Sequence, residues 1–509
     1  MNKIYQKDCE STCEFSLPDY LGDVKKILTV SASAIPSGRF VGSVEVDFSG
    51  VVSYDILYLD SEGKLTGLNL TSDYDCSVPI NEESYVDSFG EARIASVAVR
   101  LTGPRKLTAK SVVTNNILLS LEDLVDYSGD VFSDENSPEI ASKTVTVERS
   151  VFASGTEREY AEEAERLNGI TPDEIEILAT SGAVRITESE AGEGGVTVRG
   201  EIIITAIVRT DEQPPFAIKK VIPFEETVNF EGLNSGMQVM SDGYLTSVTA
   251  GVSEDAEGSI ITVNAISELY CIASENKDLT VTTDAYLKNR DTNGKYEDFE
   301  YRSIVCASSA EAKFSLEKSR AEIGCENARD ILKLSAEVKN IDKNTTSSGF
   351  VISGEASFMG ACGEIADDGN TTYFPVKFTS PFSVNVNCNT NIPSSAEVDC
   401  TVMPVDTEVY MDSDKLSVTC ALKIGYRVTK SDSLRRIYEC NTVGEEEYKS
   451  SLSNITVYYP EADECLFDIA KKFHTTGAKI ARDNNLAEET FADFQAPVSI
   501  SDVKKLIIR

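Results

Sequence analysis

Two landmarks recur three times, in phase, along the 509 residues of this chain. The first is an Ile-Leu dipeptide, and the second is a glycine that follows each leucine at the same interval. The leucines are Leu28, Leu178 and Leu332, and the glycines are Gly50, Gly200 and Gly354. Because chance would not hold two landmarks in phase over a period of about 150 residues, the pattern indicates homologous domains in tandem.

The residues around each glycine are typical of strands. Val44, Val46 and Phe48 alternate with acidic residues, and residues 202–208 are almost all β-branched. Short strands with frequent turns favour antiparallel sheets. We therefore predict a mainly β chain with three tandem antiparallel β-sandwich or barrel-like repeat domains. We also expect each repeat to pack independently, with its glycine where a strand bends or packs closely on a neighbour.

A third landmark and one helix are predicted within these blocks. Leu107, Leu279 and Leu416 each stand in a strand-like run late in a block, and we expect them to correspond. Residues 156–167, TEREYAEEAERL, are instead rich in helix formers, and the Asn-Gly dipeptide after them is a typical helix stop. This pattern predicts a linker helix before the second repeat.

The sequence pattern changes after residue 454. Residues 455–459, ITVYY, predict a strand, and the closing residues 506–508 predict another. Between them, four apolar residues recur at helical spacing, and residues 477–483 are compatible with a second helix. The four apolar residues are Leu466, Ile469, Ala470 and Phe473. The pattern predicts a small α+β domain with the order βααβ.

The charge balance argues against two classes of partner. The chain has 84 acidic and 47 basic residues, for a formal net charge of -37. Such a chain repels phosphate backbones and anionic lipid headgroups, so we expect no nucleic acid and no direct membrane insertion. The sequence also lacks an apolar run of about 18 residues and a recognisable secretory signal. We expect the protein to stay in the cytosol in which it is made.

Residues for catalysis or metal binding are scarce. The single histidine, His474, follows the predicted apolar helix face, where a partly exposed surface position is expected. The 12 cysteines form no Cys-x-x-Cys pair, so we expect buried, reduced thiols and no zinc site. We therefore predict that the chain is not an enzyme and has no catalytic, cofactor-binding or metal-binding residues.

The repeats resemble SPOCS domains, and the run 103–106, Gly-Pro-Arg-Lys, matches that family most closely. Residues 458–486, YYPEADECLFDIAKKFHTTGAKIARDNNL, resemble a LysM domain. Three SPOCS repeats followed by a LysM-like domain is the order found in the SipL-like family of spore coat morphogenetic proteins. Residues 1–20 either precede the first repeat or form part of it. The other boundaries are 21–140, 172–312 and 313–445 for the repeats, 141–171 for the linker, and 454–509 for the LysM-like domain.

The resemblance implies a non-enzymatic scaffold in endospore coat assembly, located in the mother-cell cytoplasm at the forespore surface. It implies that the LysM-like module binds the coat-basement ATPase SpoIVA and that the repeats bind other spore coat proteins. Where LysM domains usually carry Pro-Gly-Asp-Thr, this chain has Ala-Asp-Glu-Cys at 462–465, so we expect a charged surface that favours a basic protein face over a glycan. The candidate partner-binding residues are Asp463, Glu464, Lys471 and Lys472.

The alternative is a cell-wall protein that binds peptidoglycan or chitin. The LysM resemblance taken alone favours this alternative, because LysM domains in general hold polymers of N-acetylglucosamine. The missing secretory signal argues against it, because a chain that stays in the cytosol meets no such polymer.

Overall fold

The structure is a computed structural model that describes most of the chain. The described residues are 2–42, 44–79, 87–120, 138–154, 157–229, 231–256, 258–288, 290–365, 371–443, 455–461, 464–486 and 504–509. The chain divides into two compact units. The first unit is Met1–Glu122, Arg149–Glu275 and Ile304–Lys430, and the second is Asp123–Glu148, Asn276–Ser303 and Ser431–Arg509.

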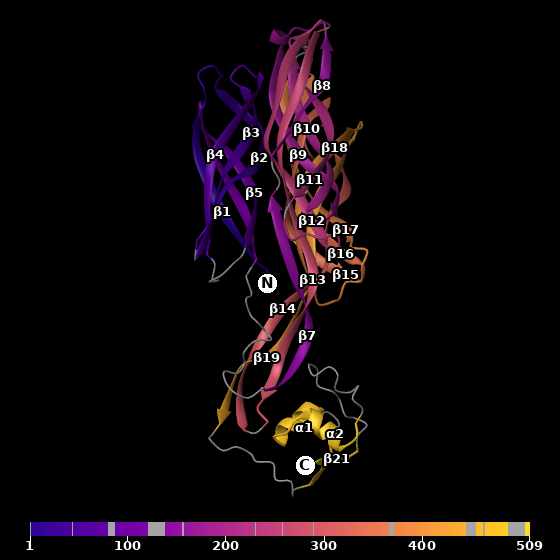
Figure 1. The fold of residues 1–509 in the computed structure, drawn as a ribbon. Helices are drawn as coiled ribbons and strands as arrows, with labels where there is room; N and C mark the ends of the chain where they lie inside the picture. Colours follow the sequence, from indigo (N-terminus) through magenta and orange to yellow (C-terminus); the bar gives the residue numbers. More distant parts are fainter. Residues whose placement is uncertain are drawn as a thin grey trace. The chain divides into compact units, whose positions relative to one another are not determined.

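The chain is mainly β, as predicted, and its long strands form antiparallel sheets in three successive blocks (Figure 1). In the first block, one sheet has the order β1-β6-β5 and the other β2-β3-β4. These strands are β1 (Asn2–Ser16), β2 (Val24–Val41), β3 (Glu45–Asp60), β4 (Leu65–Pro79), β5 (Asp87–Gly103) and β6 (Lys106–Ser120). Buried residues alternate along β3. Successive side chains of a strand point to opposite faces, so the apolar residues at every second position of the sequence all face the core.

The second and third blocks repeat this order. In the second block β9-β10-β11 form one sheet, and β12 and β8 flank β13 in the other, with β7 also paired to β13. In the third block the sheets are β15-β16-β17 and β14-β19-β18. The second-block elements are β7 (Glu139–Ser154), β8 (Arg158–Asn168), a 3-10 turn (Pro172–Glu174), β9 (Ile175–Ala191), β10 (Gly195–Thr210), β11 (Phe216–Asn229), β12 (Gln238–Asp255) and β13 (Gly258–Tyr286). The third-block strands are β14 (Asp291–Ser319), β15 (Asp330–Thr346), β16 (Gly349–Ile365), β17 (Thr371–Asn387), β18 (Ala396–Met411) and β19 (Lys415–Val443).

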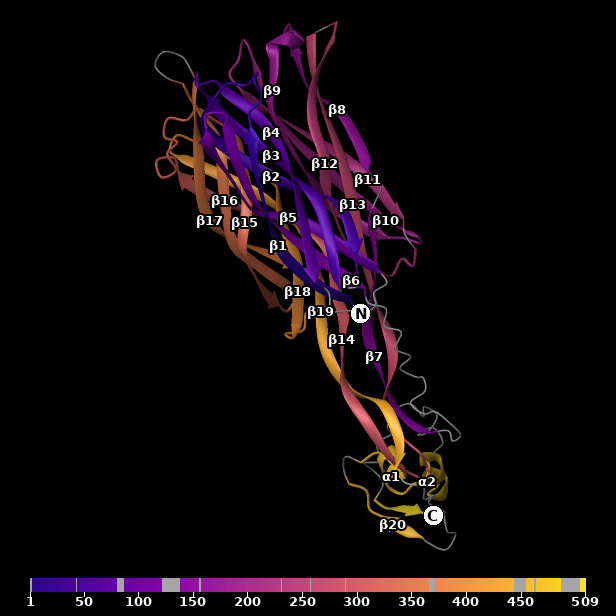
Figure 2. The same cartoon turned by 90° about the vertical axis from the view of Figure 1, so that its left-hand side faces the viewer.

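The C-terminal residues form a small module within the second unit (Figure 2). Its elements are β20 (Thr456–Tyr458), α1 (Leu466–Lys472), α2 (Gly477–Asp483) and β21 (Leu506–Ile508), and β20 pairs antiparallel with β21. The order strand, helix, helix, strand is the one that the sequence predicts. None of the helices that the structure describes is long and apolar enough to cross a membrane.

The three landmark glycines lie in the central strands β3, β10 and β16. Each is directly opposite an aromatic residue of the next strand, and a register shift in the pairing with the preceding strand adjoins it. The pairs are Gly50 with Tyr74, Gly200 with Phe224, and Gly354 with Phe382. A Cβ at Gly200 would lie 2.3 Å from the carbonyl oxygen of Arg185 and 2.7 Å from the Phe224 ring. The prediction of close packing at these glycines is confirmed.

The three landmark leucines meet in one buried cluster of the first unit. Leu28, Leu178 and Leu332 are 2%, 5% and 5% exposed, and they come from β2, β9 and β15. Burial of one such side chain is worth about 1.5–3 kcal/mol. The cluster also contains the residue seven positions after each landmark glycine, namely Leu57, Ile207 and Ala361. Each block also has apolar clusters of its own, but the prediction of independent packing is wrong because the blocks share this core.

A further glycine brings the first two blocks together. Gly67 of β4 faces the backbone of β9, and a Cβ there would lie 1.4 Å from the carbonyl oxygen of Leu178. Across the same junction, Nη1 of Arg209 donates a hydrogen bond to the carbonyl oxygen of Leu65 at 2.8 Å. The contact between the first and second blocks therefore depends on backbone approaching backbone.

The linker helix predicted at 156–167 is wrong, because the described part of this segment belongs to strand β8, Arg158–Asn168. It pairs antiparallel with β13 from Asn168 opposite Gly258 to Arg158 opposite Ser267. Tyr160 packs on Phe224 with ring centroids 6.0 Å apart. The open edge of β13 offers backbone partners along the whole segment, and this tertiary pairing overrides the helix propensity of the glutamates and alanines.

One correspondence between landmarks is also wrong. Leu107 and Leu416 occupy the same place, just after the turn of the β5–β6 and β18–β19 hairpins, and both are buried. Leu279 lies far along β13, whereas the matching hairpin of the second block turns at 255–258. The residue just after that turn is Ser259, whose hydroxyl donates to the carbonyl oxygen of Ile170 at 2.7 Å. In the second block, a buried serine with a hydrogen-bond partner thus stands where the other blocks have a buried leucine. The repeat cannot be recognised from the sequence at this position for that reason.

Strand pairing bears on the N-terminal segment and on one predicted boundary, and two of the cysteines differ from the expectation, while the other ten are free. Strand β1, within residues 1–20, pairs along its whole length with β6 and so belongs to the first block. The boundary predicted between 312 and 313 falls inside β14. Contrary to the expectation of reduced thiols, Cys9 and Cys76 form a disulfide that joins β1 to β4 and hence one sheet to the other. The two residues are distant in sequence, and only the sandwich brings them together.

Gly67→Ala should destabilise the folded chain, because a Cβ cannot fit against the Leu178 carbonyl and β4 must move away from β9. We expect a loss of about 1–3 kcal/mol in the free energy of unfolding, measured by urea denaturation followed by tyrosine fluorescence. Gly103→Ala is the matched control, since its Cβ would meet its nearest neighbour, Lys106 Cβ, at 3.7 Å. Equal stability of the two variants would contradict the close junction between the blocks.

Candidate functional site

Three of the four candidate residues predicted for partner binding, Glu464, Lys471 and Lys472, lie in or just before helix α1 of the C-terminal module. Helix α1 buries Leu466, Ile469 and Ala470, as its spacing predicts. Thr476 caps α2, and its hydroxyl accepts a hydrogen bond from the backbone N–H of Lys479 at 3.1 Å. The helices pack with β21 around one apolar cluster, so the module has its own core.

A residue outside the module completes this core. Tyr286 at the end of β13 is 1% exposed and belongs to the same apolar cluster as the α1 residues. Its hydroxyl donates to the carbonyl oxygen of Thr475 at 2.8 Å, and its ring meets the edge of Phe467 with centroids 5.0 Å apart. Burial raises the pKa of Tyr286 well above its ordinary value. The module is therefore built onto β13, and removing residues 454–509 would uncover Tyr286.

Lys471, predicted as an exposed partner-binding residue, instead anchors the module. Its Nζ lies 2.6 Å and 2.8 Å from the two carboxylate oxygens of Asp284 on β13. The hydroxyl of Tyr296 donates to the same carboxylate at 2.8 Å. Partial burial opposes the charge of Lys471, but the hydrogen bond and charge of Asp284 outweigh it and raise the lysine pKa. His474, in the turn after α1, lies beside β14, with Nε2 at 3.4 Å from Asp291 Oδ1.

Glu464 and Lys472 lie together on another side of α1, around Tyr458. The Tyr458 hydroxyl donates to both carboxylate oxygens of Glu464, at 2.6 Å and 2.7 Å, and Lys472 Nζ donates to the tyrosine oxygen at 2.9 Å. The hydrogen bond from Tyr458 holds the pKa of Glu464 below its ordinary value. Glu464 is thus largely occupied within the module, while the Lys472 side chain stays 57% exposed. Asp463 lies outside the described residues.

The sequence analysis missed an apolar surface on the same module, here called the β20 face. It consists of Ile455, Val457 and Tyr459, which are 63%, 50% and 69% exposed, together with half-buried Ile507, the register partner of Val457. Alternate residues of a strand share one face, while Leu506 and Ile508 turn to the core. Apolar residues at 455, 457 and 459 were the signal that could have revealed it. The exposed basic residues near it in sequence are Lys504, Lys505 and Arg509.

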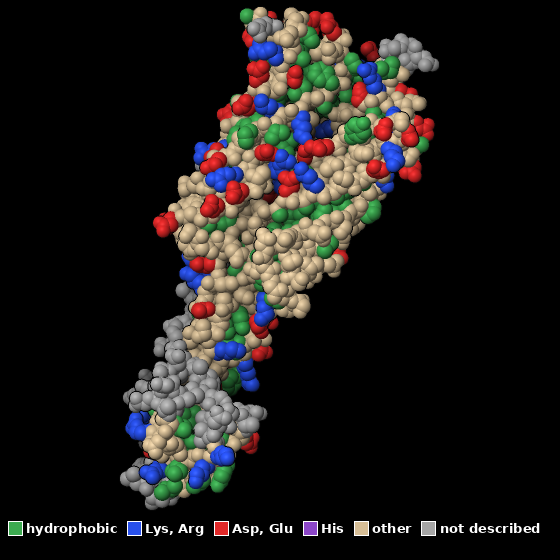
Figure 3. All heavy atoms as spheres, turned by 90° about the vertical axis from the view of Figure 1, so that its right-hand side faces the viewer, with side chains coloured by type: hydrophobic (Ala, Val, Ile, Leu, Met, Phe, Trp, Pro, Cys, Tyr) green, Lys and Arg blue, Asp and Glu red, His purple; other side chains and the backbone are tan. Residues whose placement is uncertain are grey.

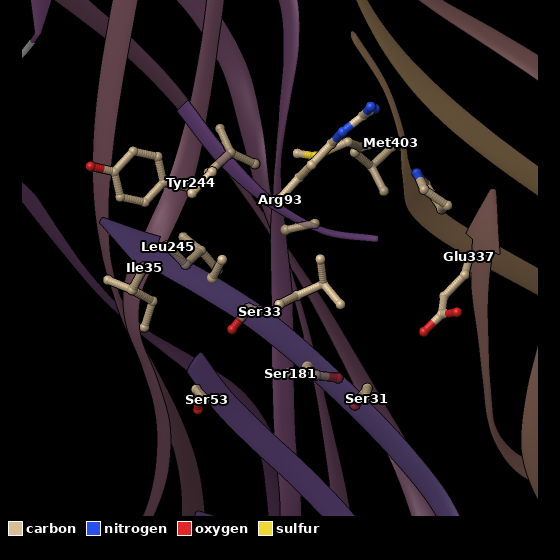
Figure 4. Close-up of a pocket in the computed structure, with 18 of the residues that line it drawn as sticks. Ser31, Ser33, Ile35, Ser53, Arg93, Ser181, Tyr244, Leu245, Glu337 and Met403 are labelled. Carbon is tan, nitrogen blue, oxygen red and sulfur yellow. The ribbon is translucent and has the colours of Figure 1, made fainter. Parts of the chain in front are cut away.

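A second candidate site is a cavity of about 1400 Å³ inside the first unit (Figure 4). Six outer strands, two from each block, contribute to its lining, together with residues of neighbouring strands in the same sheets. The six outer strands are β2, β5, β9, β12, β15 and β18. The lining in Figure 4 includes Ser31 and Ser33 from β2, Ser181 from β9 and Glu337 from β15. Open strand edges beside small polar side chains suit an extended polypeptide segment.

Charged side chains at the cavity wall and next to it join the blocks to one another. Lys423 of the third block lies 2.5 Å from Asp242 of the second, and it also donates to the carbonyl oxygen of Gly243. Lys333 of the third block donates to the Ser31 hydroxyl of the first at 3.1 Å. Burial lowers the pKa of Lys333, and the charge of nearby Asp55 opposes that shift. These contacts keep the outer strands of the three blocks in place around the cavity.

The described residues contain no group of three or more His, Cys, Asp or Glu side chains placed to hold a metal ion. On the face drawn in Figure 3, acidic and basic side chains are interspersed over the first unit.

Lys471→Ala should destabilise the second unit, because it leaves Asp284 half-buried without its cation. We expect a loss of about 1–3 kcal/mol, measured as a lower midpoint of thermal unfolding. Lys472→Ala, at an exposed neighbouring position, is the matched control and should change stability by less than about 0.5 kcal/mol. If the two variants were equally stable, Lys471 would not be an anchor.

The same ion pair predicts a dependence on pH. The pKa of Lys471 is raised in the folded chain, so the stability that the pair contributes is fully present below the ordinary lysine pKa of 10.5. It should be lost as the pH rises through the higher folded value. The stability difference between the wild type and Lys471→Ala should therefore be constant near neutral pH and shrink above that pKa.

Residues 175–253 match the model of the family described as SipL, SPOCS domain. The matched stretch begins at the start of β9 and ends within β12, so it covers one sheet of the second block and enters the other. No curated protein and no solved structure matches the chain. The match supports a relation to the SipL-like family, and the SPOCS domain connects this protein with sporulation.

Proposed function

We propose that this protein is a non-enzymatic scaffold of endospore coat assembly. Its C-terminal module is LysM-like and binds a SpoIVA-like coat morphogenetic ATPase, and its three blocks are SPOCS repeats that bind other spore coat proteins. It acts in the mother-cell cytoplasm at the forespore surface. The observation that carries the proposal is the SPOCS match in the second block, together with the strand order that the other blocks share.

The extension of the SPOCS assignment to all three blocks rests on geometry. Each block has a central strand in which a glycine faces an aromatic residue of the next strand. Each also contributes its Ile-Leu leucine to the shared cluster. Equivalent residues in equivalent places are what duplication of one domain produces.

A scaffold fits the first unit better than a catalyst does. A catalyst needs titratable groups that converge on a reacting atom, whereas the charged residues that line this cavity are spread over strands of all three blocks, beside serines, alanines and open strand edges. One of them, Lys423, links two blocks through Asp242. Surfaces of this kind hold polypeptide segments in position.

The β20 face is the proposed contact for the ATPase, and of the three candidate residues that the structure describes, Lys472 remains an exposed charge elsewhere on the module. The face offers exposed apolar side chains, as the centre of a protein interface requires. Its basic neighbours Lys504 and Lys505 favour a partner with acidic residues at the rim. Lys471 and Glu464 are proposed to act by shaping the module, because both are engaged within the second unit.

Val457→Glu should weaken co-purification of the full chain with the SpoIVA-like ATPase by at least about tenfold, because a buried charge without a partner opposes docking. Val443→Glu is the matched control, since Val443 is 54% exposed and lies outside the β20 face. Circular dichroism of both variants checks the fold. Normal binding by Val457→Glu, or equal weakening by Val443→Glu, would contradict the proposed contact. A deletion is a poorer test, because it uncovers Tyr286.

The alternative function is tested with insoluble glycans. The proposal expects the full chain to remain in solution when mixed with chitin or peptidoglycan, since Glu464 occupies a position where LysM domains usually carry a smaller residue. Sedimentation assays with each polymer measure this. Saturable binding that Val457→Glu leaves unchanged would favour the cell-wall alternative.

A further inference from the structure

Strands line the cavity of the first unit in two different ways. Strand β19, in the middle of its sheet, contributes the alternate residues Lys423, Gly425 and Arg427, and so presents one face of the sheet. Several outer strands contribute consecutive residues instead. Their runs are 31–35 of β2, 177–184 of β9, 243–250 of β12, 336–341 of β15 and 399–405 of β18. Because neighbouring residues of a strand point to opposite faces, an outer strand that lines a space with all of them turns its backbone edge toward that space.

Of these edges, that of β9 is best suited to receive another strand. From Ala179 to Ile186, β9 pairs with β10 without a register shift, and it is the last strand of its sheet. The lining runs of β5, β12, β15 and β18 each contain a register shift, which distorts an edge, and β18 also has Pro404, which lacks an N–H. The run of β2 is shorter than that of β9. Residues 179–183 are alanine, threonine, serine, glycine and alanine, so their side chains leave the backbone accessible.

The space beside this edge has the size for a polypeptide strand. Its volume of about 1400 Å³ exceeds the volume of about 300–1,000 Å³ that is usual for pockets that hold small molecules. At about 3.3 Å per residue, the run 177–184 extends over about 26 Å. A partner segment of about eight residues would match this length.

One basic side chain of the lining is available to a ligand. Arg93 of β5 is half-buried, and within the described chain it forms no hydrogen bond and no ion pair. Figure 4 shows its guanidinium reaching away from β5, on the side of the cavity where Met403 of β18 lies. A half-buried guanidinium without a counter-charge favours a carboxylate.

The other basic residues of the lining already have neighbours. Lys343 donates to a backbone carbonyl oxygen of β18 at 2.9 Å. The remaining three are matched with acidic residues: Lys339 with Glu337, Lys423 with Asp242, and Arg427 with Asp399, which lies directly opposite it on the next strand. The charge that a ligand can neutralise is therefore that of Arg93.

We propose that the cavity binds an extended polypeptide segment of a coat-protein partner, which adds as a strand to the edge of β9 at 179–184. An aspartate or glutamate side chain of this segment meets Arg93 across the cavity. Main-chain hydrogen bonds to β9 supply the affinity, and the carboxylate fixes the register of the segment. This inference rests on the proposed binding of coat proteins by the repeats and adds the kind of segment that they recognise.

The test begins with a display library of random eight-residue peptides. The library is selected on the immobilised full chain and counter-selected on Ser181→Arg, which places a long charged side chain in the cavity beside the edge of β9. We expect the selected peptides to be rich in β-branched or aromatic residues and to contain an acidic residue. Thr187→Arg, exposed on the same strand but outside the lining, is the matched control and should bind these peptides as the wild type does. Circular dichroism checks the fold of both variants.

Synthetic forms of the strongest peptide then test the mode of binding, measured by fluorescence anisotropy with the full chain. A strand that adds to an edge pairs through the N–H groups of alternate residues. Methylation of the backbone nitrogens at either the odd or the even positions should therefore weaken binding by at least about tenfold, with the other set having less effect. Arg93→Gln should weaken binding of the acidic peptide by at least about tenfold and leave binding of its amide form unchanged.

The proposal would be overturned if the library yielded no peptide that prefers the wild type and Thr187→Arg over Ser181→Arg. A selected peptide that tolerates both sets of methyl groups, or that binds Arg93→Gln as tightly as the wild type, would also overturn it. If Ser181→Arg fails to fold, selection on the wild type with the methylated peptides and Arg93→Gln still decides the question. The assay contains neither the ATPase nor a coat protein, so its failure would leave the outcome of the Val457→Glu experiment unaffected.

Discussion

The shared leucine cluster is the interaction on which the rest of the first unit depends. Leu28, Leu178 and Leu332 come from three blocks that could each have formed a separate sandwich, yet they are buried against one another. Burial of these leucines removes apolar surface from water, and it therefore stabilises the association of each block with the other two. Because the same position of the repeat is used three times, one sequence motif generates all three contacts.

This arrangement also explains the cavity. When three sandwiches converge through equivalent residues, equivalent strands line the space that they leave between them, and here those strands are the open edges of six sheets. Open edges are prone to uncontrolled pairing with other chains. Contacts between the blocks, such as that between Lys423 and Asp242, keep these edges turned toward the cavity. Other chains therefore have less access to the edges.

The C-terminal module follows a different logic, because its contacts divide its residues into two groups. Tyr286, Asp284 and Asp291 hold the helices and the turn between them from outside the module. Lys471 is engaged in these contacts, so its charge is not available at the surface of the module. The β20 face, in contrast, carries exposed apolar residues. The contacts that attach the module and its exposed apolar face therefore involve different residues of the part of the module that the structure describes.

The sequence by itself determined the class, the repeat and the local elements. Alternating apolar residues, phased Ile-Leu and glycine landmarks and the helical spacing from Leu466 to Phe473 act through neighbours along the chain, so they can be recognised without a structure. Tertiary structure decided the rest. It made 158–168 a strand because β13 has an open edge, paired Cys9 with Cys76, and turned Lys471 from a surface charge into an anchor for Asp284. Each of these outcomes depends on a residue more than 60 positions away in sequence, and only the fold determines which residue that is.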